Sequence, residues 1–231
     1  MMPRMTSEPV CDGVIITSVS SADRIVDIPE RLDGSPVTSL GARLLKSSRG
    51  AQGRVLRIPA SVVRIDRNAL EGAAGLAAVE YGGSAETFFG FGLDAPCDCT
   101  LVCGDGFSFE FKRGLPMGFP GFDRAIRSFG SGLTLEIAMR RLSDPVLLSD
   151  EDRRGYEAYV SERIMPKAEH AVTTGDVGML REALSTGLIG DGDLRRLLGR
   201  SARSGKVAVT SMLMSETSER FRRKNKLVRP K

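Results

Sequence analysis

A short motif that occurs twice near the N-terminus constrains the fold more than any other feature of this sequence. The clearer copy runs from Ile58 to Gly72: an Ile-Pro step is followed by apolar residues at Val62 and Ile65, by an Ala-Leu pair and by a closing glycine. An earlier copy begins at Ile28, about 30 residues before. Short apolar turns at such a spacing predict a solenoid whose successive turns share one apolar interior.

Features on either side of the motif predict how this solenoid begins and ends. Residues 1–9 have no regular pattern and are expected to be a loose leader, whereas Val14–Val19 is a β-prone run that would cover the first turn. At the far end, Phe107, Phe109 and Phe111 alternate along the chain, which places three rings on one face of a strand. These rings are expected to close the last turn.

The repeated motif resembles the BspA-like leucine-rich repeats, in which a strand ending in Ile-Pro leads to a Val-x-x-Ile-Gly-like step and an Ala-Phe-like return. The first copy has that step at Val37–Gly41, and the returns have Leu45 and Leu70 in place of Phe. The resemblance covers residues 25–112 and implies a short leucine-rich-repeat solenoid. It implies no particular ligand, because repeat folds bind many different partners.

Glycine and proline content predicts where the solenoid gives way to another domain. Residues 113–121 contain two prolines and three glycines, and the apolar spacing becomes helical after them. The expected organisation is a solenoid over residues 1–112, a linker over 113–121, a helical domain over 122–219 and a basic tail, expected to be disordered, over 220–231.

The helical domain contains a repeat of its own. Residues 168–214 show a helix–glycine–helix pattern twice, with Gly175 and Gly205 at equivalent positions and Val177 and Val207 two residues later. The copies resemble ankyrin-type helical pairs, although both lack the Thr-Pro-Leu-His opening. The predicted fold class is therefore α+β: a short leucine-rich-repeat β-solenoid followed by an all-α domain of ankyrin-like helical pairs.

Charge and apolar content bear on the location and the partners of the protein. The net charge is +4, but residues 220–231 contain seven basic and no acidic residues, which leaves 26 basic against 29 acidic residues elsewhere. Since nucleic-acid-binding folds carry basic residues across a face or along an element, nucleic acid is not the expected partner. Because no apolar run approaches the roughly 18–20 residues of a membrane helix and no export signal is evident, we expect a cytoplasmic protein without a membrane partner.

Clustered cysteines are the strongest candidates for a metal site. Cys97, Cys99 and Cys103 lie close together, and Cys11 or His170 would have to supply a fourth ligand for zinc. A Cys-x-Cys spacing is tight for chelation, and buried cysteines in strands behave as small apolar residues. The favoured interpretation is therefore structural, with no metal and no cofactor, and His170 is expected to be an exposed or hydrogen-bonded structural residue.

The function expected from these patterns is that of a non-enzymatic protein–protein interaction module. No residue pair supplies a nucleophile with its base, or an acid with its base, at a recognisable spacing. Partner contacts are expected from outward residues of the solenoid turns: Arg54, Arg57, Arg64, Asp66 and Arg67. The alternatives are a metal-binding protein or enzyme that uses the cysteine cluster, and nucleic-acid contact through the basic tail.

Overall fold

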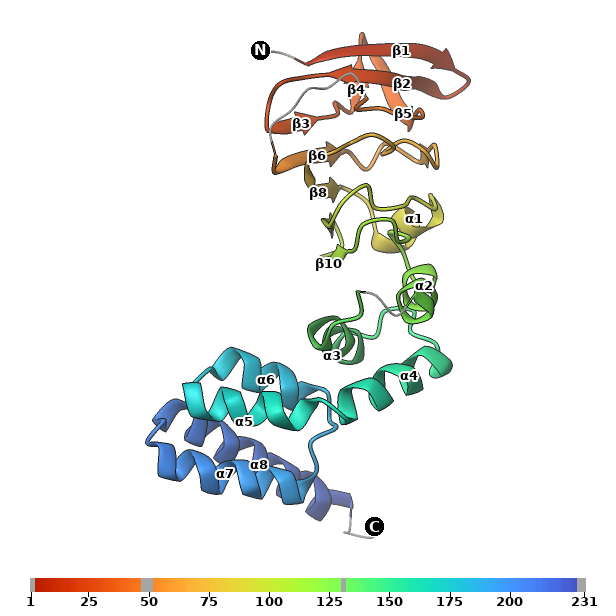
Figure 1. Cartoon of the computed structure of the whole chain (residues 1–231). Helices are drawn as coiled ribbons and strands as arrows, with labels where there is room; N and C mark the ends of the chain where they lie inside the picture. The colour runs from red at the N-terminus through yellow and green to blue at the C-terminus, as the bar shows by residue number, and fades with distance from the viewer. Residues whose placement is uncertain (1–2, 47–51, 130–131, 228–231) are drawn as a thin grey trace. The chain divides into compact units, whose positions relative to one another are not determined.

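The chain folds into two compact units, Met1–Gly132 and Leu133–Lys231 (Figure 1). The computed structural model describes residues 3–46, 52–129 and 132–227. The first unit consists of stacked strands with two helices, and the second is helical. The predicted α+β class, a β-solenoid followed by an all-α region, is confirmed.

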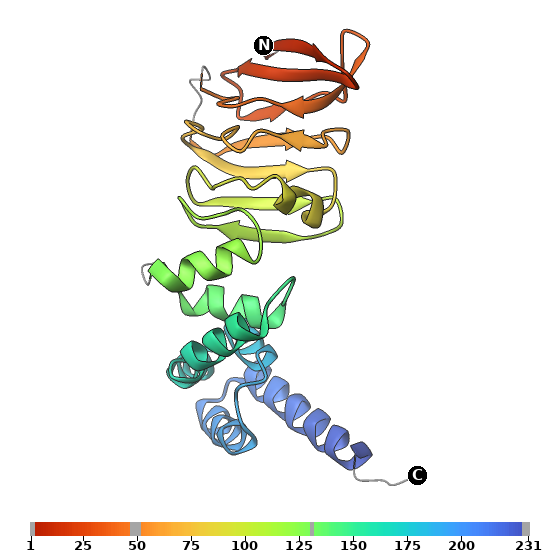
Figure 2. The same ribbon diagram turned by 90° about the vertical axis from the view of Figure 1, so that its right-hand side faces the viewer.

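The strands of the first unit stack one above the next (Figure 2). One sheet has the order β1-β2-β5-β4, with β7 also paired to β5, and the other has the order β10-β9-β8-β6-β3. The strands are β1 (Arg4–Val10), β2 (Gly13–Ser20), β3 (Ile25–Asp27), β4 (Arg31–Leu32), β5 (Ser35–Leu40), β6 (Arg54–Ile58), β7 (Arg64–Ile65), β8 (Leu76–Tyr81), β9 (Cys99–Cys103) and β10 (Ser108–Phe111). The two helices of this unit are α1 (Ala85–Gly90) and α2 (Gly121–Phe129).

A continuous row of buried side chains crosses the second of these sheets. Strands β3, β6, β8 and β9 are parallel, and β10 joins β9 antiparallel. The residues in register are Val26, Leu56, Val79, Leu101 and Phe109, and all five are buried. Because side chains alternate across a strand, one row of every turn contributes to the same interior. The inward direction predicted for Ile28, Val37, Ile58 and Ile65 is confirmed, since all four are buried.

The turns repeat with a spacing of 25 residues at their returns. The N–H of Val19 donates to the Leu44 carbonyl (2.8 Å), and the N–H of Leu44 donates to the Ala69 carbonyl (2.9 Å). The two Ile-Pro steps are 30 residues apart because the first turn has five extra residues between Ile28 and Val37, which are nine residues apart, whereas Ile58 and Val62 are four apart. Strands β4 and β5 pair antiparallel within this insertion.

The N-terminal end of the solenoid is covered by a strand that the sequence did not reveal. The expectation of a loose leader over residues 1–9 was wrong for residues 4–9, because β1 pairs antiparallel with β2 along its length. Exposed and half-buried positions alternate along β1, and Pro9 lies within it. A polar edge strand of this kind lacks the apolar pattern by which strands are recognised in a sequence. It nevertheless shields the first turn, and its polar side chains and proline disfavour pairing with other chains.

The C-terminal end of the solenoid is closed by phenylalanine rings. Phe109 and Phe111 of β10 are buried, as predicted, and they pack against Phe119 and Phe122 at centroid distances of 5.2–5.6 Å. Phe119 comes from the predicted linker and Phe122 from α2. The boundary thus differs from the expected linker at 113–121: this segment and α2 belong to the first unit, because the last turn needs an apolar cover.

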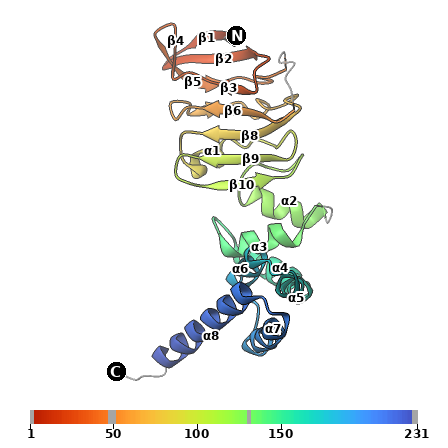
Figure 3. The same cartoon turned by 90° about the vertical axis from the view of Figure 1, so that its left-hand side faces the viewer.

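The helices of the second unit contact one another in successive pairs along the chain (Figure 3). They are α3 (Leu135–Ser143), α4 (Asp150–Ser161), α5 (Ile164–Thr174), α6 (Val177–Ser185), α7 (Asp191–Ser204) and α8 (Val207–Leu227). Gly175 and Gly205 end α5 and α7 with φ of 84° and 68°, the left-handed conformation in which glycine carries no steric penalty. The predicted glycine corners are confirmed.

The last two pairs stack in the same order, since α5 packs against α7 and α6 packs against α8. Leu197 and Val209 are among the side chains buried between them. Helix α8 continues to Leu227, so the described part of the predicted tail is helical rather than disordered. Its first arginine anchors it, because Arg220 donates to the Ile189 carbonyl at 2.6 Å and pairs with Glu216.

Candidate interaction surfaces

Arg54 cannot contact a partner, although it was expected to do so. It is only 3% exposed, and its guanidinium donates to the carbonyl of Ser21 at 3.0 Å. The side chain therefore joins β6 to the segment that follows β2. The sequence could not show this, because arginine at a strand position is usually at the surface.

Arg57 is exposed, as expected, but it is engaged within the outer face of its sheet. It pairs with Asp27 on β3 (3.5 Å) and with Glu80 on β8 (2.7 Å). The hydrogen bond that Arg57 donates to the Glu80 carboxylate, followed by the negative charge of Glu80, raises the pKa of the Arg57 guanidinium. Exposed ion pairs of this kind contribute little to stability, typically below about 1 kcal/mol each. The two ion pairs of Arg57 therefore mainly fix the positions of the side chains.

The remaining expected contact residues lie on other parts of the turns. Arg64, on β7 of the other sheet, donates to Asp12 at 2.9 Å, and this hydrogen bond lowers the pKa of the Asp12 carboxyl. Asp66 accepts the N–H of Asn68, and Arg67 lines a hollow of about 360 Å³. The structure therefore does not bring the five expected residues together on one surface.

The clustered cysteines do not converge either. Cys99 and Cys103 are the two ends of β9 and both are buried. Four residues of strand separate their Cα atoms by about 13 Å, too far for a shared ion. The Cys97 thiol instead donates to the Leu76 carbonyl at 2.8 Å. Within the described ranges, no group of three or more potential ligands is close enough to hold a metal.

Burial should make the thiols of Cys99 and Cys103 much less reactive than the exposed thiol of Cys11. Desolvation raises the pKa of Cys99 and of Cys103 to about 12, so at pH 8 roughly one in ten thousand of these thiols is ionised. We expect a disulfide reagent at pH 8 to modify the exposed Cys11 rapidly and to leave Cys99 and Cys103 intact until urea is added. Rapid modification of Cys103 in the folded protein would contradict its placement.

The same two thiols give stability a definite pH dependence. Because their pKa values are raised, the folded state retains protons that the unfolded state loses above its pKa of about 9. Their contribution is therefore fully present below about pH 9 and is lost as the pH rises towards 12.

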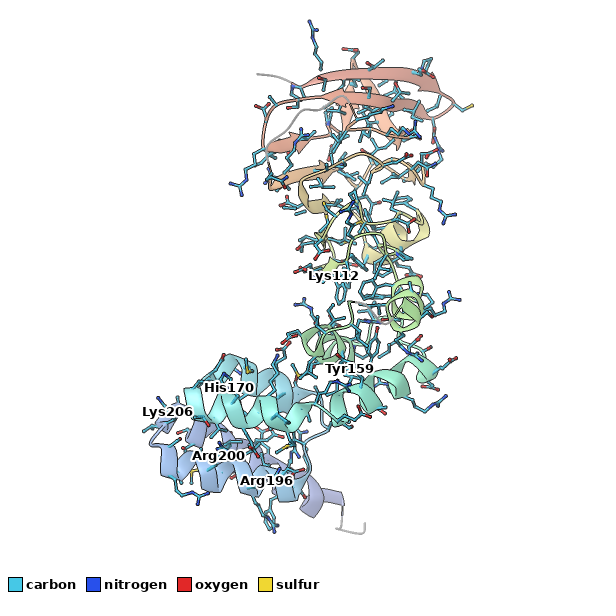
Figure 4. The ribbon with its side chains drawn as sticks, viewed as in Figure 1. Lys112, Tyr159, His170, Arg196, Arg200 and Lys206 are labelled. Atoms are coloured by element: carbon cyan, nitrogen blue, oxygen red, sulfur yellow. The ribbon has the colours of Figure 1, made fainter. Side chains whose placement is uncertain are left out.

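The exposed face of α5 and α7 carries three cationic residues and the histidine (Figure 4). Arg196 and Arg200 lie on α7, Lys206 follows the glycine corner of α7, and His170 lies on α5. Arg196 and Arg200 both pair with Glu169 of α5, at 3.7 and 2.8 Å. This network joins the two helices, so much of the charge on this face is already compensated. His170 is exposed, within the range expected for it.

The excess of basic residues is not confined to residues 220–231, because α7 and α8 are basic as well. From the start of α7, residues 191–231 contain 12 basic and 4 acidic residues, a net charge of +8, which leaves 21 basic and 25 acidic residues, a net charge of −4, for residues 1–190. Residues 194–215 contain no acidic residue at all. The positive charge therefore belongs to folded helices as well as to the tail.

Helix α8 also exposes a stripe of large apolar side chains. Val207, Met214 and Phe221 are 77%, 57% and 67% exposed, and they follow one another at intervals of seven residues. Seven residues correspond to about two helical turns, so the three side chains lie along one side of α8. The seven-residue spacing is visible in the sequence, but the spacing alone does not distinguish an exposed side of α8 from a buried one.

A groove of about 940 Å³ runs along another side of α8, between this helix and α6. Small side chains leave it open: Ala208, Ser211 and Ser215 line it from α8. Its charges have both signs, with Arg181 on α6 and Glu216 and Glu219 on α8. It is therefore a mixed-charge groove, distinct from the apolar stripe.

Comparison with protein-family models, with curated proteins and with solved structures finds no match to this chain. In the described part of the chain, no helix combines the length and the apolar character that crossing a membrane requires.

Proposed function

We propose that this protein is a non-enzymatic protein-interaction module and that its contact surface is the outer side of α7 and α8. The observation that carries the proposal is the stripe of Val207, Met214 and Phe221 on α8. Isolated exposed apolar residues are ordinary, but an ordered row of large ones marks an interaction site.

The resemblance to known repeat families supports the same proposal. The turns that contain Ile28-Pro29 and Ile58-Pro59 resemble BspA-like leucine-rich repeats, and the pairs with corners at Gly175 and Gly205 resemble ankyrin-like repeats. Both kinds of repeat offer extended surfaces to partners. We place the protein in the cytoplasm on the basis of its sequence.

The test replaces the stripe and keeps the fold. A photo-reactive residue at position 214 captures the protein that contacts α8, and that protein is then purified and its affinity measured. We expect the triple variant Val207→Ser/Met214→Ser/Phe221→Ser to bind it about 100-fold more weakly, since each truncation at the centre of an interface costs about 1 kcal/mol or more.

The matched control is Val63→Ser, which removes a comparably exposed apolar side chain (52%) from the solenoid. It should leave the affinity unchanged, and both variants should unfold at the urea concentration of the original protein. Equal affinity of the triple variant and the original protein would refute the proposal.

A further inference from the structure

We infer that the partner of the α7/α8 face is an acidic amphipathic helix, which lies along α8 and continues the helical stack. This inference rests on the proposed interaction function and specifies the chemistry of the partner. Its basis is the combination of the apolar stripe with the charges beside it.

The spacing of the stripe favours a helical partner. From Val207 to Phe221 the stripe is about 21 Å long, the length of four turns of helix. Helices that pack side by side do so through apolar residues whose pattern repeats every seven residues, whereas a strand would present side chains at every second residue. In this unit α5 already packs against α7, and α6 against α8.

Basic residues flank the stripe. Arg195 of α7 lines a hollow of about 110 Å³ together with Phe221 and Thr217 of α8, so its guanidinium belongs to the same face. Arg222 follows Phe221 and is exposed. Among the described residues, no carboxylate pairs with Arg195 or Arg222, so both are available to a partner.

The acidic residues of α7 and α8 near the stripe either face the groove towards α6 or form ion pairs with arginines of α8. Glu216 and Glu219 line the groove towards α6, and they pair with Arg220 and Arg223. Asp191 lies at the hollow, but it is within 3.7 Å of Arg220. The face around the stripe therefore has a positive balance, which is complementary to carboxylates on a partner.

This balance argues against a second copy of the chain as the partner. In a two-fold symmetric contact the patch around the stripe, which includes Arg195 and Arg222, meets the same patch of the other copy. Residues 191–231 have a net charge of +8, so two surfaces of the same sign would face each other, and like charges at an interface oppose association. An acidic helix satisfies the same arginines.

The stripe also argues against nucleic acid. Phosphates are bound by basic and polar side chains, and bases stack on aromatic rings. Val207 and Met214 offer neither, although they occupy most of the length of the stripe. An amphipathic helix with leucines facing the stripe and glutamates at its edges matches the apolar and the basic residues together.

The experiment uses the full chain and two designed helical peptides of about 21 residues. Both have leucine at every seventh position, flanked by glutamate in one peptide and by lysine in the other. We expect the glutamate peptide to bind with a Kd near or below about 100 μM and the lysine peptide to bind at least about tenfold more weakly. The variant Arg195→Glu/Arg222→Glu should reverse this preference.

The control variant is Arg153→Glu/Arg154→Glu, which makes the same change of charge on α4 and should leave the preference as it is. The inference is overturned if the glutamate peptide does not bind at about 1 mM, or if both peptides bind equally. A dimer in sedimentation that Met214→Ser abolishes would also overturn it, because the stripe would then bind a second copy of the chain. The same holds if an oligonucleotide with the charge of the glutamate peptide binds more tightly than that peptide and Met214→Ser leaves the oligonucleotide binding intact. Should the peptides fail while the stripe variant still loses its captured partner, the interaction function stands and the acidic helix does not.

Discussion

Phe122→Ala is expected to lower the free energy of unfolding of the first unit by about 3–5 kcal/mol, the usual cost of removing a buried phenylalanine ring. Phe122 has no exposed surface, and the centroid of its ring lies 5.3 Å from the ring centroids of both Phe109 and Phe111. The residue belongs to α2, outside the solenoid that the sequence predicts. A loss of this size would establish that α2 is the cover of the last turn.

The matched control is Phe221→Ala, which removes the same ring from an exposed position in the second unit. It should change stability by less than about 0.5 kcal/mol. The free energy of unfolding of the first unit is measured separately from that of the second by recording amide exchange in peptides of β9 and β10 at increasing urea concentration. A Phe122→Ala variant whose strands exchange as slowly as those of the original protein would contradict the role of α2.

Arg54→Ala is expected to lower the free energy of unfolding by about 2–4 kcal/mol, although arginine-to-alanine changes usually matter little. The substitution removes a buried hydrogen bond to the carbonyl of Ser21 and the packed stem of the arginine side chain. Affinity for a partner should remain unchanged at a temperature where the variant is folded.

Arg57→Ala provides the comparison on the same strand. Arg57 lies three residues from Arg54 but is about half exposed, and its two ion pairs are at the surface. Its loss should cost less than about 1 kcal/mol. Similar stability of the two variants in urea unfolding would contradict the burial of Arg54.

Much of the architecture was predictable because it depends on local patterns. The Ile-Pro steps placed Ile28 and Ile58 correctly in the shared interior, and Gly175 and Gly205 were correctly predicted as corners. Both signals rest on properties of single residues: apolar side chains leave water, and glycine adopts positive φ without strain. Such properties act wherever the residue occurs.

The errors concern features that only neighbouring turns determine. The leader was predicted to be loose because β1 is a polar edge strand, and its pairing depends on β2. The linker was predicted from its glycines and prolines, but Phe119 of that segment packs on Phe109. The burial of Arg54 likewise depends on a carbonyl 33 residues away.

The candidate site was less predictable than the fold. Outward arginines of the solenoid were reasonable candidates, yet Arg57 and Arg64 are engaged in ion pairs on different sheets. The stripe on α8 was present in the sequence as a seven-residue spacing. Only the packing of the opposite side of α8 shows that Met214 is exposed rather than part of the core.

Amide hydrogen exchange of the full chain with and without the glutamate peptide is the most direct test of the proposed α8 contact. The contact should slow exchange in peptides that cover residues 207–221, with the solenoid strands and α3 unchanged. Slower exchange confined to the solenoid around Arg57 and Arg64, with α8 unaffected, would contradict the assignment of the interaction surface to the last helical pair.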